Sequence, residues 1–267
     1  NLFKYKLLGD AMMQDFTSNE AISISEGIRE YIDLELNICW ARFDESYRRG
    51  LLCATDIKHK ELYYNKENRI SIDKLGEMLK QENFTAIQQR LEECGMRSGF
   101  ACLFYGSPGT GKTETVLQLA RSTGRDIMQV NVANIKSKFV GESEKNIKGI
   151  FGRYRACCEK SEVKPILLFN EADAIINKRS TNIAHSVDKM ENAIQNIILE
   201  EIEKLDGILI ATTNLTSNMD GAFERRFIYK VEFQKPDIET KERIWLSMIH
   251  DLDMADAHLL ASEFDLS

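Results

Sequence analysis

From residue 100 onward, short apolar runs alternate with segments in which apolar side chains recur every three or four positions. The runs predict strands at 100–105, 126–132, 165–169, 208–212 and 227–233. The helical patterns cover residues 112–122, 143–158 and 187–204. Strands that alternate with helices in this way predict an α/β fold, a parallel sheet with helices on both faces. Ligand chemistry then belongs at the carboxyl ends of the strands.

The parts on either side of this alternation are patterned as helices. Apolar positions at helical spacing predict a helical N-terminal extension over residues 1–94, and two further helices open a lid subdomain over residues 236–267. The core is therefore expected at residues 95–235. Tyr63 and Tyr64 lie in the segment that leads into the core, where they could either contact a ligand or pack in the interior.

Composition narrows the class of protein. The 267 residues are 43% hydrophobic and 29% charged, which is ordinary for a globular protein. A net charge of −7 argues against a broad nucleic-acid surface, and no apolar run reaches membrane-spanning length. The six cysteines form no CxxC pair, and with four scattered histidines they give no zinc spacing. Free thiols in a reducing cytosol, and so a cytoplasmic protein, are the expectation.

A glycine-rich loop follows the first predicted strand of the core. It comprises Gly106, Ser107, Pro108, Gly109, Thr110, Gly111, Lys112 and Thr113. The glycines allow the backbone to curl so that its N–H groups point at phosphate oxygens. Lys112 is expected to reach the β- and γ-phosphates, and the Thr113 hydroxyl to ligate Mg²⁺. Strand, loop and helix in this order predict a nucleotide-binding P-loop fold with ATP and Mg²⁺ as cofactors.

Polar side chains follow two of the other predicted strands. The strand at 165–169 runs into Asn170, Glu171 and Asp173, and the strand at 208–212 runs toward Asn214. Glu171 is placed to activate an attacking water, and Asn214 to hydrogen-bond that water and the γ-phosphate. Asn170 lies at the end of this strand, where its side chain is expected to face the magnesium ion.

A pair of arginines follows in Met219–Phe227. Arg225 and Arg226 are expected to reach the γ-phosphate of a neighbouring subunit, because a guanidinium suits the spread charge of a phosphoryl group. The alternative is that they are ordinary surface arginines.

Together these four elements resemble the AAA+ ATPase family, a P-loop NTPase three-layer sandwich, over about residues 95–267. The spacing is similar to the protein-remodelling branch that includes katanin and spastin. The resemblance implies Mg-ATP hydrolysis with Glu171 as catalytic base, Asn214 as first sensor, and Arg225 and Arg226 as fingers acting in trans. It also implies a homo-oligomer, a hexameric ring, whose activity depends on assembly.

The segment Lys138–Lys145 looks like the first pore loop of that branch. Phe139 would grip an unfolded polypeptide in a central channel, with Val140 and Gly141 beside it. The resemblance therefore implies a protein substrate. The alternative is that Phe139 packs beneath its own loop.

Two departures from the family pattern bear on activity. The family usually has Asp where this chain has Asn170, and an amide polarises the magnesium shell less well than a carboxylate. Asp173 could compensate in part, or hydrolysis could be slow. We also expect part of the lid, with its second-sensor arginine, to be missing from this sequence.

The expected function is an ATPase that remodels or translocates a protein through a ring pore. One alternative is a nucleic-acid motor or loader, for which Lys136 and Lys138 offer thin support. Another is a nucleotide-gated scaffold that binds ATP but hydrolyses it weakly, motivated by Asn170.

Overall fold

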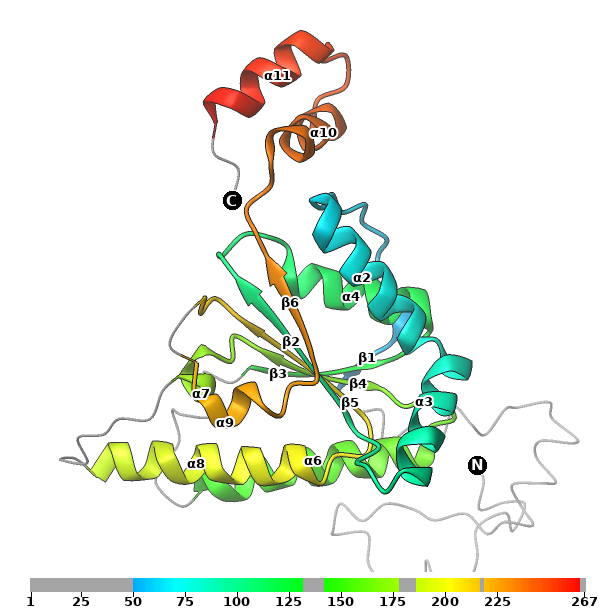
Figure 1. Cartoon of the computed structure of the whole chain (residues 1–267), viewed down its shortest axis with the longest axis vertical. Coiled ribbons are helices and arrows are strands. Elements are labelled where there is room, and N and C mark those ends of the chain that lie inside the picture. Colours follow the sequence, from blue (N-terminus) through cyan, green and yellow to red (C-terminus); the bar gives the residue numbers. More distant parts are fainter. Residues whose placement is uncertain (1–49, 132–141, 178–185, 217–218, 265–267) are drawn as a thin grey trace, which may run out of the picture. The chain divides into compact units, whose positions relative to one another are not determined.

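A six-stranded sheet forms the centre of the computed structural model, which describes residues 50–131, 142–177, 186–216 and 219–264. The strands lie in the order β1-β3-β4-β5-β2-β6 (Figure 1). Neighbouring strands are parallel except for β1, which pairs antiparallel with β3. The bounds are β1 Leu51–Leu52, β2 Phe100–Gly106, β3 Ile127–Asn131, β4 Ile166–Asn170, β5 Ile208–Thr213 and β6 Tyr229–Phe233. The predicted parallel sheet is confirmed.

Side chains alternate between two buried faces along the central strands. On β2, Cys102 and Phe104 belong to the core cluster that includes α2 and α4 residues, while Leu103 is buried on the other side. Because both faces are covered, these strands read as continuous apolar runs rather than as alternating ones. Burial raises the pKa of the Cys102 thiol, as expected for a core cysteine.

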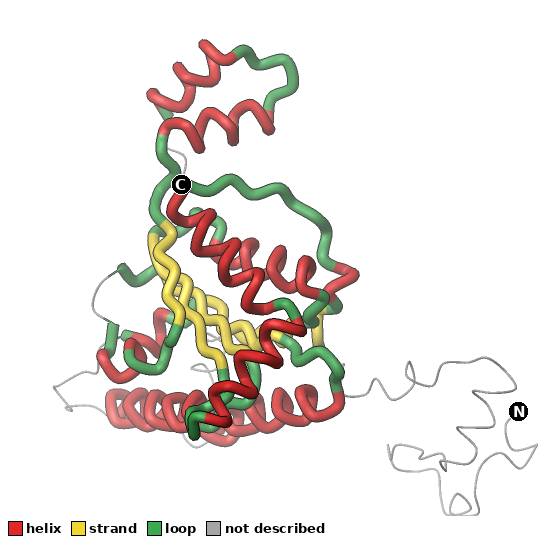
Figure 2. Tube along the Cα trace, turned by 45° about the vertical axis from the view of Figure 1, so that its right-hand side comes forward, coloured by secondary structure: helices red, strands yellow, loops and turns green. Residues whose placement is uncertain are grey.

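One face of the sheet is covered by α2 (Lys66–Leu79), α3 (Gln81–Glu93) and α4 (Lys112–Thr123), as the core cluster and Figures 1 and 2 show. The corner after α4 is fixed by Arg125, which is fully buried. Its guanidinium donates to the carbonyl oxygens of Leu79 (2.8 Å) and Lys164 (2.7 Å) and to Gln81 Oε1 (2.9 Å). Arg125 therefore joins the end of α2 to the start of β4.

The opposite face is covered by the long helices α6 (Glu142–Lys160) and α8 (Ser186–Glu203), with the short helices α7 (Asp173–Ile176) and α9 (Gly221–Glu224) nearby (Figure 1). Phe151 of α6 packs edge-on against Phe169 of β4, with ring centroids 5.6 Å apart. The buried Tyr154 hydroxyl donates toward Pro165 O (2.8 Å) and accepts from Ile208 N (2.7 Å). A side chain at Gly207 would collide with this hydroxyl, at 2.4 Å.

The segment that leads into the core is part of the same compact unit, which begins at Gly50. Strand β1 joins the sheet edge, and the short 3-10 helix η5 (Ala54–Asp56) donates its Ala54 N–H to Asp126 Oδ1 at 3.0 Å. Residues 50–94, expected in the helical extension, thus pack with residues 95–264. The rest of the expected extension, residues 1–49, lies outside the described residues.

Two helices follow β6, as predicted. They are α10 (Ile238–Met248) and α11 (Met254–Glu263). Each begins with an aspartate cap: Asp237 Oδ1 accepts from Thr240 N (2.8 Å) and Asp253 Oδ1 from Asp256 N (2.7 Å). Across the pair, Trp245 packs edge-on against Phe264 at 6.3 Å. No helix in the described ranges combines the length and apolar character that crossing a membrane requires.

Candidate nucleotide site

The glycine loop between β2 and α4 has a backbone that only glycine readily adopts. Gly106, Gly109 and Gly111 have φ values of 137°, 79° and 86°. A Cβ at Gly106 would also lie 2.1 Å from the carbonyl oxygen of Phe233, so β2 and β6 approach closely there. The loop is therefore held curled between the end of a central strand and the first turn of a helix, the geometry that presents N–H groups to an anion.

Lys112 and Thr113 open the helix beneath this loop. The Lys112 ammonium is buried within it and donates to Gly106 O (2.9 Å) and Ser107 O (2.6 Å). Burial lowers the pKa of Lys112, and the nearby Asp173 carboxylate opposes that shift. Thr113 Oγ1 donates to Asn170 Oδ1 at 2.8 Å, which ties the loop to the end of β4.

The ends of β4 and β5 meet beside the loop. Thr212 Oγ1 donates to Asn170 Oδ1 (2.8 Å) and accepts from the Glu171 N–H (3.3 Å). Glu171 is exposed and has a positive φ of 54°, which turns the chain sharply after β4. A cavity of about 360 Å³ lies here, lined by Pro108, Gly109, Gly111, Lys112, Thr113, Glu114, Asn170, Glu171, Thr212, Thr213 and Asn214. The structure thus brings Lys112, Thr113, Asn170, Glu171 and Asn214 to one cavity, together with part of the glycine loop.

Asp173 is fully engaged at the neighbouring corner. Its carboxylate accepts from the Thr213 hydroxyl, from the Asn214 N–H (2.7 Å) and from the Asn214 amide (3.5 Å). Its role is therefore to hold Asn214 at the end of β5. The roles predicted for Glu171 and Asn214 in hydrolysis stay predictions.

A second cavity of about 420 Å³ adjoins the first and shares Gly109 and Gly111 with it. Its walls are the lead-in segment with Tyr63 and Tyr64, the end of β6 with Gln234 and Pro236 after it, and α10. The Arg243 guanidinium lies 5.1 Å above the Tyr63 ring. The flat aromatic and apolar wall next to a phosphate loop suits the base and sugar of a nucleotide.

Two asparagines of the lead-in segment, which the sequence analysis missed, hold this second cavity together. Asn65 Nδ2 donates to Lys235 O (3.0 Å), and Asn65 Oδ1 accepts from Asp237 N (3.0 Å), so one side chain spans the joint between β6 and α10. Asn68 donates to Glu232 O at 2.5 Å. All three bonds join residues more than 160 positions apart, so no local sequence pattern could predict them.

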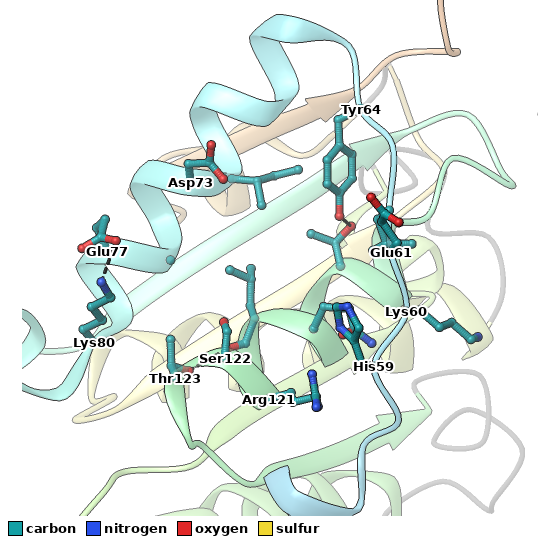
Figure 3. A pocket seen from close by; sticks show the side chains of 16 residues that line it. His59, Lys60, Glu61, Tyr64, Asp73, Glu77, Lys80, Arg121, Ser122 and Thr123 are labelled. Atoms are coloured by element: carbon teal, nitrogen blue, oxygen red, sulfur yellow. Dashed lines mark hydrogen bonds and ion pairs between the residues drawn. The ribbon is translucent and has the colours of Figure 1, made fainter. Parts of the chain in front are cut away.

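Tyr64 separates the second cavity from a third one, of about 680 Å³, between α2, α4 and the lead-in segment. Figure 3 shows Tyr64 pointing from that segment toward α4. Its hydroxyl bonds Thr115 Oγ1 (2.8 Å), and Thr115 in turn donates to Gly111 O (2.9 Å). Burial raises the pKa of Tyr64 to about 12. Tyr64 is therefore both a wall of the second cavity and a support for the glycine loop.

The two arginines after α9 have different surroundings. Arg226 is half-buried, donates to Ala222 O (3.0 Å) and forms an ion pair with Glu203 of α8. Arg225 is exposed, and its side chain forms no hydrogen bond or ion pair with another described residue. Arg226 thus anchors α9 to α8, while Arg225 is free to reach outward. The predicted pore-loop residues Phe139, Val140 and Gly141 lie outside the described residues, as do Lys136 and Lys138.

Comparison with known proteins settles the family. The family model described as "ATPase family associated with various cellular activities (AAA)" matches residues 102–235, half of the chain. The chain belongs to the AAA ATPase family. The match contains the glycine loop, both strand ends and the arginine pair, so the predicted family is confirmed.

Curated relatives share the ATPase part of the chain. A 26S proteasome regulatory subunit 4 homolog from Oryza sativa subsp. japonica is 32% identical over 175 residues, covering 62% of this chain and 37% of the relative. The vesicular-fusion protein SEC18 of Candida albicans is 29% identical over 171 residues, 60% and 21% of the two chains. Fidgetin-like protein 1 of Drosophila melanogaster is 28% identical over 159 residues, 56% and 28%. The chain therefore spans well under half the length of these AAA proteins, and the matches do not single out a katanin- or spastin-like branch.

Proposed function

We propose that this AAA protein binds ATP and hydrolyses it to remodel or translocate a protein substrate. One observation supports this most. The curled glycine loop, with Lys112 and Thr113, lines one cavity together with the ends of β4 and β5, and hydrogen bonds to Asn170 link these parts. The adjoining aromatic cavity gives the nucleoside a place, and the exposed Glu171 next to the phosphate loop gives an attacking water a general base. Asn214, held by Asp173, orients that water and the γ-phosphate.

We further propose that the active form is a homo-oligomeric ring, a hexamer in the katanin- and spastin-like manner, in the cytoplasm. Arg225 would act on the nucleotide of the next subunit, and its exposure favours it over Arg226. Phe139, Val140 and Gly141 would grip the polypeptide in the pore. The names of relatives that act with the proteasome or in vesicular fusion support a protein rather than a nucleic-acid substrate, as does the net charge of −7.

Magnesium would be held by oxygens of the chain that carry no charge. The Thr113 hydroxyl and Asn170 Oδ1 lie 2.8 Å apart, and among the described residues no group of three or more His, Cys, Asp or Glu side chains is arranged to hold a metal ion. Hydroxyl and amide oxygens are acceptable ligands for Mg²⁺. This set suits a magnesium ion that arrives on the nucleotide's phosphates, where it would neutralise their charge.

A complementation experiment tests the action in trans. Glu171→Gln removes the base, and Arg225→Ala removes the finger, so each variant alone should hydrolyse ATP slowly. In a mixture, Arg225 from one variant can serve the intact Glu171 of the other, so turnover should exceed the sum of the two alone. Arg90→Ala, which removes an exposed arginine on α3, is the matched control and should keep wild-type turnover. A mixture no faster than its parts would contradict the proposal.

A weakly hydrolysing, nucleotide-gated scaffold is the second candidate, and Asn170 is the observation that favours it. If hydrolysis is limited by the missing carboxylate, Asn170→Asp should raise turnover by about tenfold or more.

A further inference from the structure

We propose that Asn170 makes nucleotide binding by this chain largely independent of magnesium, because its amide offers the phosphates a hydrogen-bond donor where an acid would repel them. The inference rests on the proposed ATP site. It concerns which form of the ligand the site accepts: metal-free nucleoside triphosphate as well as the magnesium complex.

The orientation of the Asn170 amide follows from its neighbours. The Thr212 hydroxyl accepts from the Glu171 N–H (3.3 Å) and donates to Asn170 Oδ1 (2.8 Å). Thr113 donates to the same oxygen (2.8 Å). With two hydroxyl donors on Oδ1, the carbonyl side of the amide faces the threonines, and Nδ2 is turned away from them.

The Nδ2 group keeps both of its hydrogens for an incoming ligand. Among the described residues it has no hydrogen-bond acceptor, and Asn170 lines the same cavity as the glycine loop. A phosphate oxygen is a strong acceptor for such an N–H group, and a bond to an ionised acceptor is stronger than one between neutral groups.

The acids nearby lie at positions other than that of Asn170. Asp173 accepts hydrogen bonds from Thr213 and Asn214, and its charge acts on Lys112. Glu114 lines the cavity but is paired with Lys60 at 2.9 Å. Glu171 is exposed, and it is the one remaining acid among the described residues that line this cavity. Among the described residues, the side chain that hydrogen-bonds Thr113 is therefore the neutral Asn170 amide, and Lys112 carries a positive charge within the loop.

A neutral side chain at position 170 changes the relative affinity of the site for metal-free and magnesium-bound nucleotide. A carboxylate close to a polyphosphate repels it unless a cation stands between them, so a site with an acid there gains much of its affinity from magnesium. An amide removes that repulsion and adds a donor. Affinity for ATP should thus change little when magnesium is withdrawn.

The test measures ATP binding to the full chain by isothermal titration calorimetry, in Mg²⁺ and in excess EDTA. For the wild type we expect the two dissociation constants to differ by less than about tenfold. For Asn170→Asp we expect affinity in EDTA to fall further, so that the ratio of the two constants rises by about tenfold or more. Asn83→Asp is the matched control: it makes the same chemical change at an exposed side chain on α3 that lines none of the three cavities, and it should leave the ratio near that of the wild type.

Wild-type binding that weakens by about 100-fold or more in EDTA would overturn the inference. So would a folded Asn170→Asp variant, checked by its thermal midpoint, with an unchanged ratio. Absence of ATP binding in both buffers is a different result, because it would remove the proposed function itself and the inference with it. The wild-type ratio needs no variant, so a misfolded Asn170→Asp protein would not spoil the test.

Discussion

Replacing Arg125 by methionine should destabilise the protein strongly although this residue touches no part of the nucleotide cavities. Its guanidinium is buried without a carboxylate partner and donates to three oxygens at the junction of α2, α3 and β4, while stacking 4.9 Å above the Phe84 ring. Because α2 begins beside the second cavity, the junction at its other end also positions Asn68 and the lead-in segment.

The magnitude follows from two opposing effects. Each hydrogen bond from a charged donor contributes about 1.5–3 kcal/mol, so the three bonds together contribute roughly 5–9 kcal/mol. Burial lowers the pKa of Arg125 from 12.5 to about 10, and at 1.36 kcal/mol per unit this corresponds to a cost of roughly 3 kcal/mol for holding the charge. Methionine fills much of the volume but leaves two main-chain carbonyls without a donor, so we expect a net loss of about 3 kcal/mol.

Urea unfolding near neutral pH measures this loss. With a slope of about 2–3 kcal/mol per molar urea, the midpoint should fall by about 1 M with the slope unchanged. Arg121→Met is the matched control, since Arg121 is exposed near the end of α4, four residues before Arg125, and contacts no described side chain by hydrogen bond or ion pair. A midpoint shift for Arg125→Met no larger than that of the control would refute the reasoning.

Three further predictions follow from the site. Burial raises the pKa of folded Tyr64 to about 12 from an unfolded value near 10, so its stabilising contribution is present below pH 10 and is lost between pH 10 and 12. Tyr64→Phe should therefore reduce the fall in the free energy of unfolding over that range by roughly 3 kcal/mol, as measured by urea unfolding at each pH. Asn65→Ala removes both hydrogen bonds that this side chain makes between the end of β6 and the start of α10. The Asp237 amide should then exchange with deuterium about tenfold faster, as measured by mass spectrometry of the 232–240 segment. Unchanged exchange would mean that other contacts hold this joint. Glu203→Gln should lower the free energy of unfolding by about 1 kcal/mol, because it removes the ion pair with Arg226, and it should leave ATP affinity unchanged. A loss of ATP affinity would show that this ion pair affects the nucleotide site.

The sequence was most informative where a pattern is local. The glycine loop and the apolar runs that end in Asn170 and Thr213 predicted the strands and the cavity between them, because strand, loop and helix are each encoded by neighbours. The two-residue strand β1 is too short to leave a periodic signal. The contrast between Arg225 and Arg226 depends on Glu203 in α8, so no reasoning from the adjacent pair could separate them.

The sequence predicted only some of the residues around the second cavity, because their contacts also depend on segments that are distant in the sequence. The sequence indicated that Tyr63 and Tyr64 either contact a ligand or pack in the interior, and the structure shows that they line a cavity with α10. Asn65 reads as an ordinary turn residue, and its use as a bridge across the β6–α10 joint comes from packing between distant segments. Partial compensation by Asp173 for the missing carboxylate at Asn170 stays a prediction, since Asp173 bonds Thr213 and Asn214 while its charge acts on Lys112.

The most direct test of the account is steady-state ATP turnover across a wide range of protein concentrations, for the wild type and for Glu171→Gln. We predict that wild-type turnover per subunit rises with concentration as subunits assemble, and that Glu171→Gln lowers it by about 100-fold or more while ATP still binds. Turnover per subunit that stays constant on dilution, or that survives the loss of Glu171, would contradict an assembled ATPase with Glu171 as its base.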